Sequence, residues 1–81
     1  MKISLRFFAS VREAIGEDRL EHQTGASNVR ELRAELAARG EPWPLLLEEA
    51  TLAAVNQELC DNDQPLGEGD EVAFFPYMTG G

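Results

Sequence analysis

The sequence predicts an α+β fold of two layers, in which a mixed β-sheet carries one main helix across one of its faces. Apolar and polar residues alternate near both ends of the chain, as in strands with one buried face, and the clearest amphipathic helix lies between those segments. A chain of 81 residues has room for one domain with one core. We therefore expect a domain over residues 1–76 and a mobile tail over residues 77–81.

The first predicted strand is the segment in which Ile3, Leu5 and Phe7 alternate with polar residues. Continuing the same alternation by one residue puts Phe8 on the polar face of the sheet. An aromatic side chain on that face is therefore expected at the end of the first strand.

A short helix and a second strand are expected next. Ser10 and Glu13 have the spacing of a capping box, which predicts a helix of one to two turns capped by Ser10, and Gly16 is a natural stop. Residues 18–23 are polar but of strand length, and they are predicted to return beside the first strand.

The main helix is predicted over residues 28–39. Asn28 is its expected cap, with Glu31 three residues further on, and Gly40 and Pro42 end it. One stripe of this helix is apolar and should face the core: Val29, Leu32 and Leu36.

The second half of the chain is predicted to complete the sheet. Residues 43–50 suit a helical turn packed on the core, residues 52–55 and 58–60 suit two short strands, and residues 67–70 suit a turn. Residues 71–76 alternate again and predict the last strand, in which Phe75 faces the polar side.

The charge distribution excludes one class of partner. The net charge is −8, and every Lys and Arg lies at or before Arg39, so the second half of the chain is acidic throughout. Nucleic-acid binding through that half is not expected. Two interpretations of the carboxylates remain open: a surface that keeps the protein soluble, or one that steers it toward a basic partner.

Composition also restricts the chemistry. One cysteine, Cys60, and one histidine, His22, cannot form an internal disulfide or a Cys/His metal cluster, and we expect no metal site. We expect His22 to be a strand residue and Cys60 a packed thiol. The chain has no phosphate-cradling Gly-rich motif and no nucleophile with an evident base, so an enzyme in its own right is not expected. The sequence contains no signal-peptide or membrane-spanning pattern, which predicts a soluble cytoplasmic protein without membrane contact.

The candidate functional feature is the terminal pair Gly80 and Gly81. Residues without a Cβ can pass through a channel too narrow for other side chains and bring the backbone close to another protein's active site. The α-carboxylate is ionised at neutral pH and can attack an activated phosphate of ATP to give an acyl adenylate. Five extended residues reach about 17 Å, enough to enter a partner while the domain stays outside.

Several segments of the chain resemble the small-subunit family of molybdopterin synthases. They are spread over nearly the whole sequence: residues 5–13 (LRFFASVRE), 53–57 (AAVNQ), 65–76 (PLGEGDEVAFFP) and 79–81 (TGG). The resemblance implies a β-grasp, ubiquitin-like fold. It also implies that a separate E1-like enzyme uses ATP to adenylate the C-terminus, which a sulfur-donating enzyme then converts to a thiocarboxylate.

The resemblance further assigns roles to residues and partners. Sulfur would pass from Gly81 to a cyclic pyranopterin phosphate in the large subunit, with no cofactor bound by this chain and the catalytic residues on that subunit. The residues inserted with the tail would be Gly80, Thr79 and Met78. The surface for the large subunit would include Phe8, Leu59 and Phe75, two of which the strand alternation independently puts on the polar face.

One departure and three alternatives accompany this resemblance. The family commonly has two prolines after its paired phenylalanines, whereas Pro76 is followed here by Tyr77 and Met78, which predicts a more flexible tail. The nearest alternative is the sulfur carrier of thiamine synthesis, which shares the fold and the Gly-Gly end. The second is a ubiquitin-like protein modifier, and the third is a plain interaction domain with an inert tail.

Overall fold

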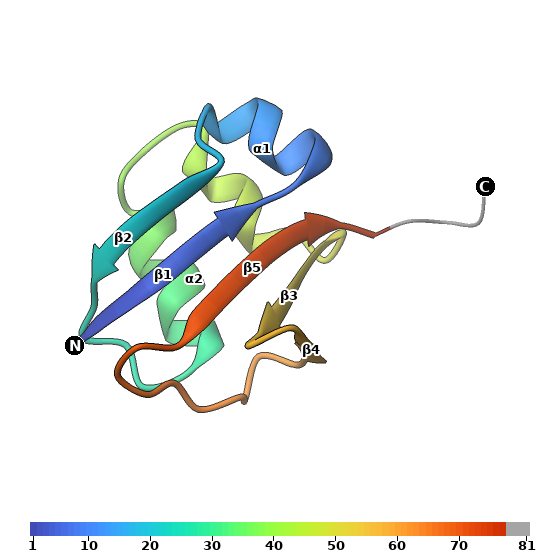
Figure 1. Cartoon of the computed structure of the whole chain (residues 1–81). Coiled ribbons are helices and arrows are strands. Elements are labelled where there is room, and N and C mark those ends of the chain that lie inside the picture. The colour runs from blue at the N-terminus through green and yellow to red at the C-terminus, as the bar shows by residue number, and fades with distance from the viewer. Residues whose placement is uncertain (78–81) are drawn as a thin grey trace.

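The computed structural model of the chain describes residues 1–77 and contains five strands, two α-helices and one 3₁₀ helix within them (Figure 1). In chain order these elements are β1 (Lys2–Phe7), α1 (Ala9–Ile15), β2 (Arg19–Gln23), α2 (Val29–Ala37), η1 (Trp43–Leu47), β3 (Thr51–Val55), β4 (Glu58–Cys60) and β5 (Glu71–Pro76). All five predicted strands are confirmed, with boundaries within one residue of those expected. None of the helices described over residues 1–77 is long and apolar enough to cross a membrane.

The strands form one mixed sheet in the order β2-β1-β5-β3-β4. The first and last strands of the chain, β1 and β5, lie side by side and parallel at its centre, and the other neighbours pair antiparallel. Helix α2 crosses one face of the sheet (Figure 1). This two-layer arrangement is the β-grasp, ubiquitin-like fold, so the predicted fold class is confirmed.

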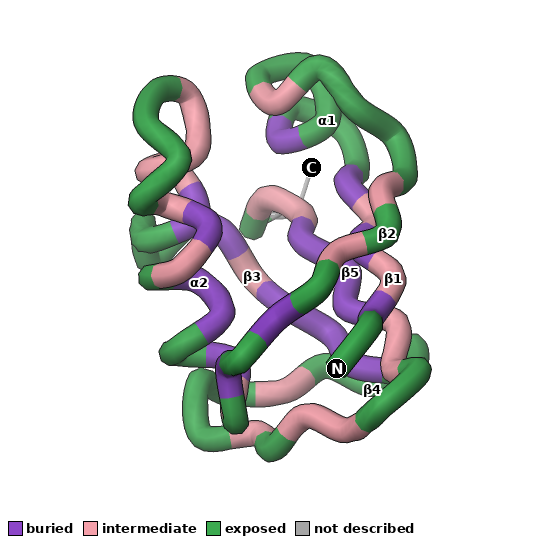
Figure 2. Tube along the Cα trace, turned by 90° about the vertical axis from the view of Figure 1, so that its left-hand side faces the viewer, coloured by how far each residue is buried: buried purple, intermediate pink, exposed green. Residues whose placement is uncertain are grey.

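The core lies between the sheet and its helical layer. Alternate residues of β1 are fully buried, as the period of a strand with one covered face requires, and buried segments alternate with accessible ones along the strands in Figure 2. The ring of Phe7 stacks on that of Phe74 at 6.2 Å and meets Trp43 edge-on at 5.8 Å. Both geometries are favourable for aromatic pairs, so the two central strands are joined by aromatic packing as well as by hydrogen bonds.

The predicted cap of α1 is wrong. The helix begins at Ala9 with Phe8 as its N-cap, and no side chain caps it. Strand β1 runs directly into the helix, so the Phe8 carbonyl accepts from the N–H groups of Val11 and Arg12 while Ser10 already lies in the first turn. The predicted stop is confirmed, because Gly16 has a φ of 85° and donates to the Arg12 carbonyl at 2.8 Å.

The predicted start of α2 is confirmed. The Asn28 side chain accepts from the Glu31 N–H at 2.9 Å. The Glu31 carboxylate reaches back one residue further than a capping box requires and accepts from both the N–H and the hydroxyl of Ser27. The helix ends at Ala37, two residues before the predicted end, and residues 38–39 continue as a turn.

Candidate functional site

One face of the sheet remains open where α2 covers the other. Cross-strand pairing brings together apolar residues on this open face: Ala54 pairs with Ala73 and with Leu59, and Leu52 pairs with Phe75. Directly opposite residues project from the same face of a sheet. Ala54 and Ala73 are buried and yet lie outside the core cluster, as expected for small side chains that larger neighbours on the open face shield from water. We call this set, with Phe8, the open-face patch: Phe8, Leu52, Ala54, Leu59, Ala73 and Phe75.

Phe8 joins the patch because β1 continues one residue beyond its last ladder pair. Its backbone is extended, with φ −126° and ψ 150°, and its N–H donates to the Phe74 carbonyl at 3.1 Å. The alternation that buries Phe7 therefore turns Phe8 to the open side, where it is 40% exposed. Sequence alternation had predicted this placement, and it is confirmed.

The other two predicted interface residues come from neighbouring parts of the sheet. Phe75 lies on β5, where it is half-buried beside Leu52 of β3. Leu59 is 69% exposed on the edge strand β4. Leu59 is the most exposed of the large hydrophobic residues that the structure describes, and apolar residues gathered on one face are typical of an interaction surface. Their role in binding a partner stays a prediction.

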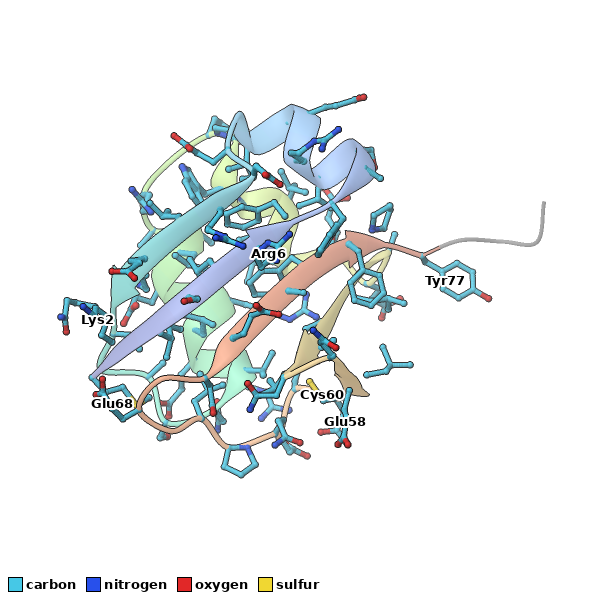
Figure 3. All side chains as sticks on the ribbon, viewed as in Figure 1. Lys2, Arg6, Glu58, Cys60, Glu68 and Tyr77 are labelled. Atoms are coloured by element: carbon cyan, nitrogen blue, oxygen red, sulfur yellow. The ribbon has the colours of Figure 1, made fainter. Side chains whose placement is uncertain are left out.

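The predicted tail follows directly after β5, the strand that bears Phe75. Strand β5 ends at Pro76, and the Tyr77 N–H still donates to the Ala50 carbonyl at 2.6 Å, so backbone pairing extends one residue into the predicted tail. The Tyr77 side chain is exposed and points away from the domain in Figure 3. The remaining predicted tail residues, which include the predicted reacting group, lie outside the described residues: Met78, Thr79, Gly80 and Gly81.

Cys60 is partly buried against the core, as predicted for a packed thiol. Burial raises the pKa of the Cys60 thiol, the charge of Asp61 adds to the rise, and the guanidinium of Arg33 opposes it. A thiol with a raised pKa is a poor nucleophile at neutral pH. Cys60 therefore has the environment of a packed thiol, as expected from the sequence.

The burial of the cation Arg33 was not predicted from the sequence. Its Nη1 donates to the carbonyls of Leu46 and Thr51 at 2.6 and 2.8 Å, and it joins α2 to the end of η1 and the start of β3. Arg33 follows Val29 by four residues, which places it on the same stripe of α2 as the apolar residues. That spacing could have indicated its burial.

His22 is a strand residue, as expected, and it pairs with Glu35 of α2 at 2.5 Å. This contact ties the edge strand β2 to the helical layer. His22 is directly opposite the buried Ile3, so it lies on the helical side of the sheet and is part of the scaffold.

Comparison with known proteins agrees with this geometry. Residues 5–81 match the model of the ThiS family. The chain belongs to the ThiS family. The match includes the three residues of the open-face patch predicted from the resemblance, and it extends to the Gly-Gly end.

Individual members and structures are also similar. The chain is 50% identical over 80 residues to the molybdopterin synthase sulfur carrier subunit of Escherichia coli (strain K12), covering 98% of this chain and 99% of that one. It is 32% identical to a chain in the solved complex of subunits 1 and 2 of molybdopterin-converting factor from Helicobacter pylori 26695, with full coverage of both chains and a TM-score of 0.67. The crystal structure of SAMP1 from Haloferax volcanii, at 22% identity, shares the fold, with a TM-score of 0.78 and full coverage of both chains.

Proposed function

We propose that this chain is the sulfur carrier subunit of a molybdopterin synthase, with the C-terminal carboxyl of Gly81 as its working group. The observation that carries the proposal is the 50% identity to a protein of that name over almost the full length of both chains. The open-face patch supports it, because the strand that bears Phe75 is also the strand from which the terminal segment departs.

The chemistry of the proposal needs no catalytic side chain on this subunit. An oxygen of the Gly81 carboxylate attacks the α-phosphorus of ATP on a separate activating enzyme, and pyrophosphate leaves. A sulfur nucleophile supplied by a sulfur-donating enzyme then displaces AMP from the acyl adenylate, which leaves a thiocarboxylate. The thiocarboxylate sulfur bonds to a cyclic pyranopterin phosphate in the large subunit. Water then cleaves the bond between the Gly81 acyl carbon and that sulfur, which leaves the sulfur on the pterin and regenerates the carboxylate.

The small size of the chain explains why the domain would dock on the large subunit while the reaction takes place in that subunit's active site. The domain packs its aromatic core between a five-stranded sheet and one main helix, and a chain of this size leaves little interior for an enclosed active site. The open-face patch would hold the large subunit, and Met78, Thr79 and Gly80 would carry Gly81 into its active site. Small residues near the terminus suit a narrow channel.

The direct test is formation of the thiocarboxylate. The chain is incubated with the activating enzyme, ATP and a sulfur donor after Cys60 has been blocked, and the product is trapped with a reagent that alkylates a terminal thiocarboxylate. Intact mass alone is ambiguous, because exchange of oxygen for sulfur adds nearly the mass of one methionine oxidation and Met78 lies in the same terminal fragment. A Met78→Leu variant removes that ambiguity. If the modified terminus never forms on a folded chain, the proposal is wrong.

The same experiment, continued, separates the two neighbouring functions. A thiocarboxylated carrier of the molybdenum pathway passes its sulfur to a pyranopterin phosphate when the large subunit is added. A thiamine carrier would not, and a protein modifier would accumulate an isopeptide adduct to lysine that survives reduction. Release of the carboxylate form together with a sulfurated pterin is the expected result.

A further inference from the structure

Two arginines lie side by side on the open face of this acidic protein. The antiparallel register of β1 and β2 sets Arg6 directly opposite Arg19. Arg6 lies between Leu5 and Phe7, both fully buried in the core, so its own side chain projects from the opposite, open side. Residues directly opposite in an antiparallel pair share a face, with Cβ atoms about 5 Å apart, so Arg19 projects there too.

This pairing is unfavourable within the chain itself. Like charges directly opposite on a sheet destabilise it, and the nearest carboxylate only partly compensates, because Glu71 Oε2 lies 3.9 Å from Arg6 Nη1. The Nε of Arg6 is buried and has no hydrogen-bond partner among the described residues. The guanidinium therefore retains unused donor capacity in the free chain.

Arg6 also borders the open-face patch. Its Cζ lies 5.2 Å from the centroid of the Phe8 ring, and Figure 3 shows Arg6 toward the C-terminal end of β1. A protein that covers Phe8 will therefore also cover the guanidinium stacked on it. Removing a cation from water without a partner costs far more than a packed aromatic gains, so the covering surface has to provide acceptors.

We propose that Arg6 and Arg19 form a charged border of the docking face, and that the large subunit that receives the tail presents carboxylate groups opposite them. The proposal rests on the proposed function. Arginine suits this role because its planar fork pairs with a carboxylate through two parallel hydrogen bonds. The patch then supplies apolar contact area, and the arginine pair fixes the orientation in which the tail points into the partner.

Binding and folding measurements on matched variants test this inference. Affinity for the large subunit of the same organism is measured by calorimetry for the parent chain, Arg19→Gln, Arg19→Lys and the double variant Arg6→Gln/Arg19→Gln. The control is Arg30→Gln, which makes the same change in net charge on α2, across the sheet from the open face, where Arg30 pairs with Asp63 at 2.7 Å.

We expect Arg19→Gln to weaken binding about tenfold and the double variant further, as for truncated interface arginines. Arg19→Lys keeps the charge but loses the two-bond fork, so it should recover only part of the affinity. Added salt should weaken binding of the parent more steeply than binding of the double variant. Arg19→Gln should unfold at the same or higher denaturant concentration than the parent, because it removes a repulsion.

Three results would overturn the inference. The first is a loss of affinity in Arg19→Gln no larger than in Arg30→Gln, and the second is lowered folding stability with unchanged affinity. The third is a parent chain that self-associates in sedimentation while Arg19→Gln does not, which would make this face an interface between copies. A parent chain that fails to bind the large subunit at all would refute the proposed function itself, a result distinct from these three.

Discussion

Asn56 and Glu71 exchange two hydrogen bonds. The Asn56 N–H donates to the Glu71 carbonyl at 2.8 Å, and the Glu71 N–H donates to the Asn56 side-chain oxygen at 3.0 Å. Asn56 and Gln57 form the two-residue turn between β3 and β4, both with positive φ, which matches the twist of the strands they connect. This one side chain therefore fixes the hairpin that carries Leu59 to the start of β5.

Replacing Asn56 by Ala should lower the free energy of unfolding by about 1–2 kcal/mol. It removes the side-chain hydrogen bonds to the Glu71 N–H and the Asp70 carboxylate and places a less tolerant residue at a φ of 51°. Denaturant unfolding measures the change. Asn56→Gly is the matched control, since it restores backbone freedom but not the hydrogen bonds and should recover only part of the loss. Equal stability of all three chains would contradict the role given to the side chain.

Ala9→Gly should stabilise the domain by about 0.5–1 kcal/mol. Ala9 has a φ of 52°, a left-handed conformation that costs an L-residue about 1 kcal/mol, and it lies where the chain turns from β1 into α1 directly after Phe8. A thermal melt of the two chains measures this. The same exchange at Ala38, which has an ordinary right-handed conformation, should destabilise or leave the melting temperature unchanged. A lower melting temperature for Ala9→Gly would refute the strain.

Phe75→Ala and Phe74→Ala should separate binding from folding in adjacent residues. Phe75 lies in the open-face patch, so its truncation should weaken affinity for the large subunit by 1 kcal/mol or more, a factor of about five or greater, with little loss of stability. Phe74 is fully buried and stacks on Phe7, so its truncation should cost about 3–5 kcal/mol of folding free energy. Phe8→Ala and Leu59→Ala should behave like Phe75→Ala. Unchanged affinity in all three patch variants would remove the interface assignment.

The His22–Glu35 pair should make stability depend on pH in the acid range. Desolvation by itself would raise the pKa of Glu35, but hydrogen bonds from His22, Thr24 and Gly25 outweigh it and hold that pKa below its ordinary value of about 4.3. The unfolded chain therefore takes up this proton more readily than the folded chain does. The contribution is present above the ordinary pKa and is lost as the pH falls through the lower folded value.

Glu35→Gln tests that linkage. The unfolding free energy, measured at pH 6 and at pH 3, should fall less in this variant than in the parent. Glu13→Gln, at an exposed carboxylate on α1, should follow the parent. A parent-like fall in Glu35→Gln would show that other carboxylates carry the acid sensitivity.

Deleting Gly81 should abolish sulfur transfer without changing the melting temperature by more than about a degree. Among the described residues the core cluster extends to Phe74, and we expect a residue at the end of the predicted tail to contribute almost no buried area. Gly80→Val should leave folding equally unaffected and block activation, because a branched side chain does not fit where the backbone must approach closely. Normal adenylation of Gly80→Val would remove the channel argument, and a large fall in melting temperature would place the terminus in the folded domain.

The local rules worked wherever one face of an element is buried. Alternation in β1 and β5 and the stripe of α2 follow directly from solvent being on one side, so the elements, the fold class and the outward placement of Phe8 and Phe75 could be predicted from sequence. The cap of α1 could not, because the extended backbone of Phe8 depends on its hydrogen bond to Phe74 in a strand more than sixty residues away.

The sequence by itself therefore determined the strands, the main helix, the outward placement of the aromatic pair and the terminal glycines, because each depends only on residues that are close together in the chain. Tertiary structure alone decided which distant residues meet: Arg6 with Arg19, Asn56 with Glu71, and Arg33 with the carbonyls of Leu46 and Thr51. Strand register and the position of α2 across the sheet determine these contacts. Both depend on how the whole core packs, which no local sequence pattern encodes.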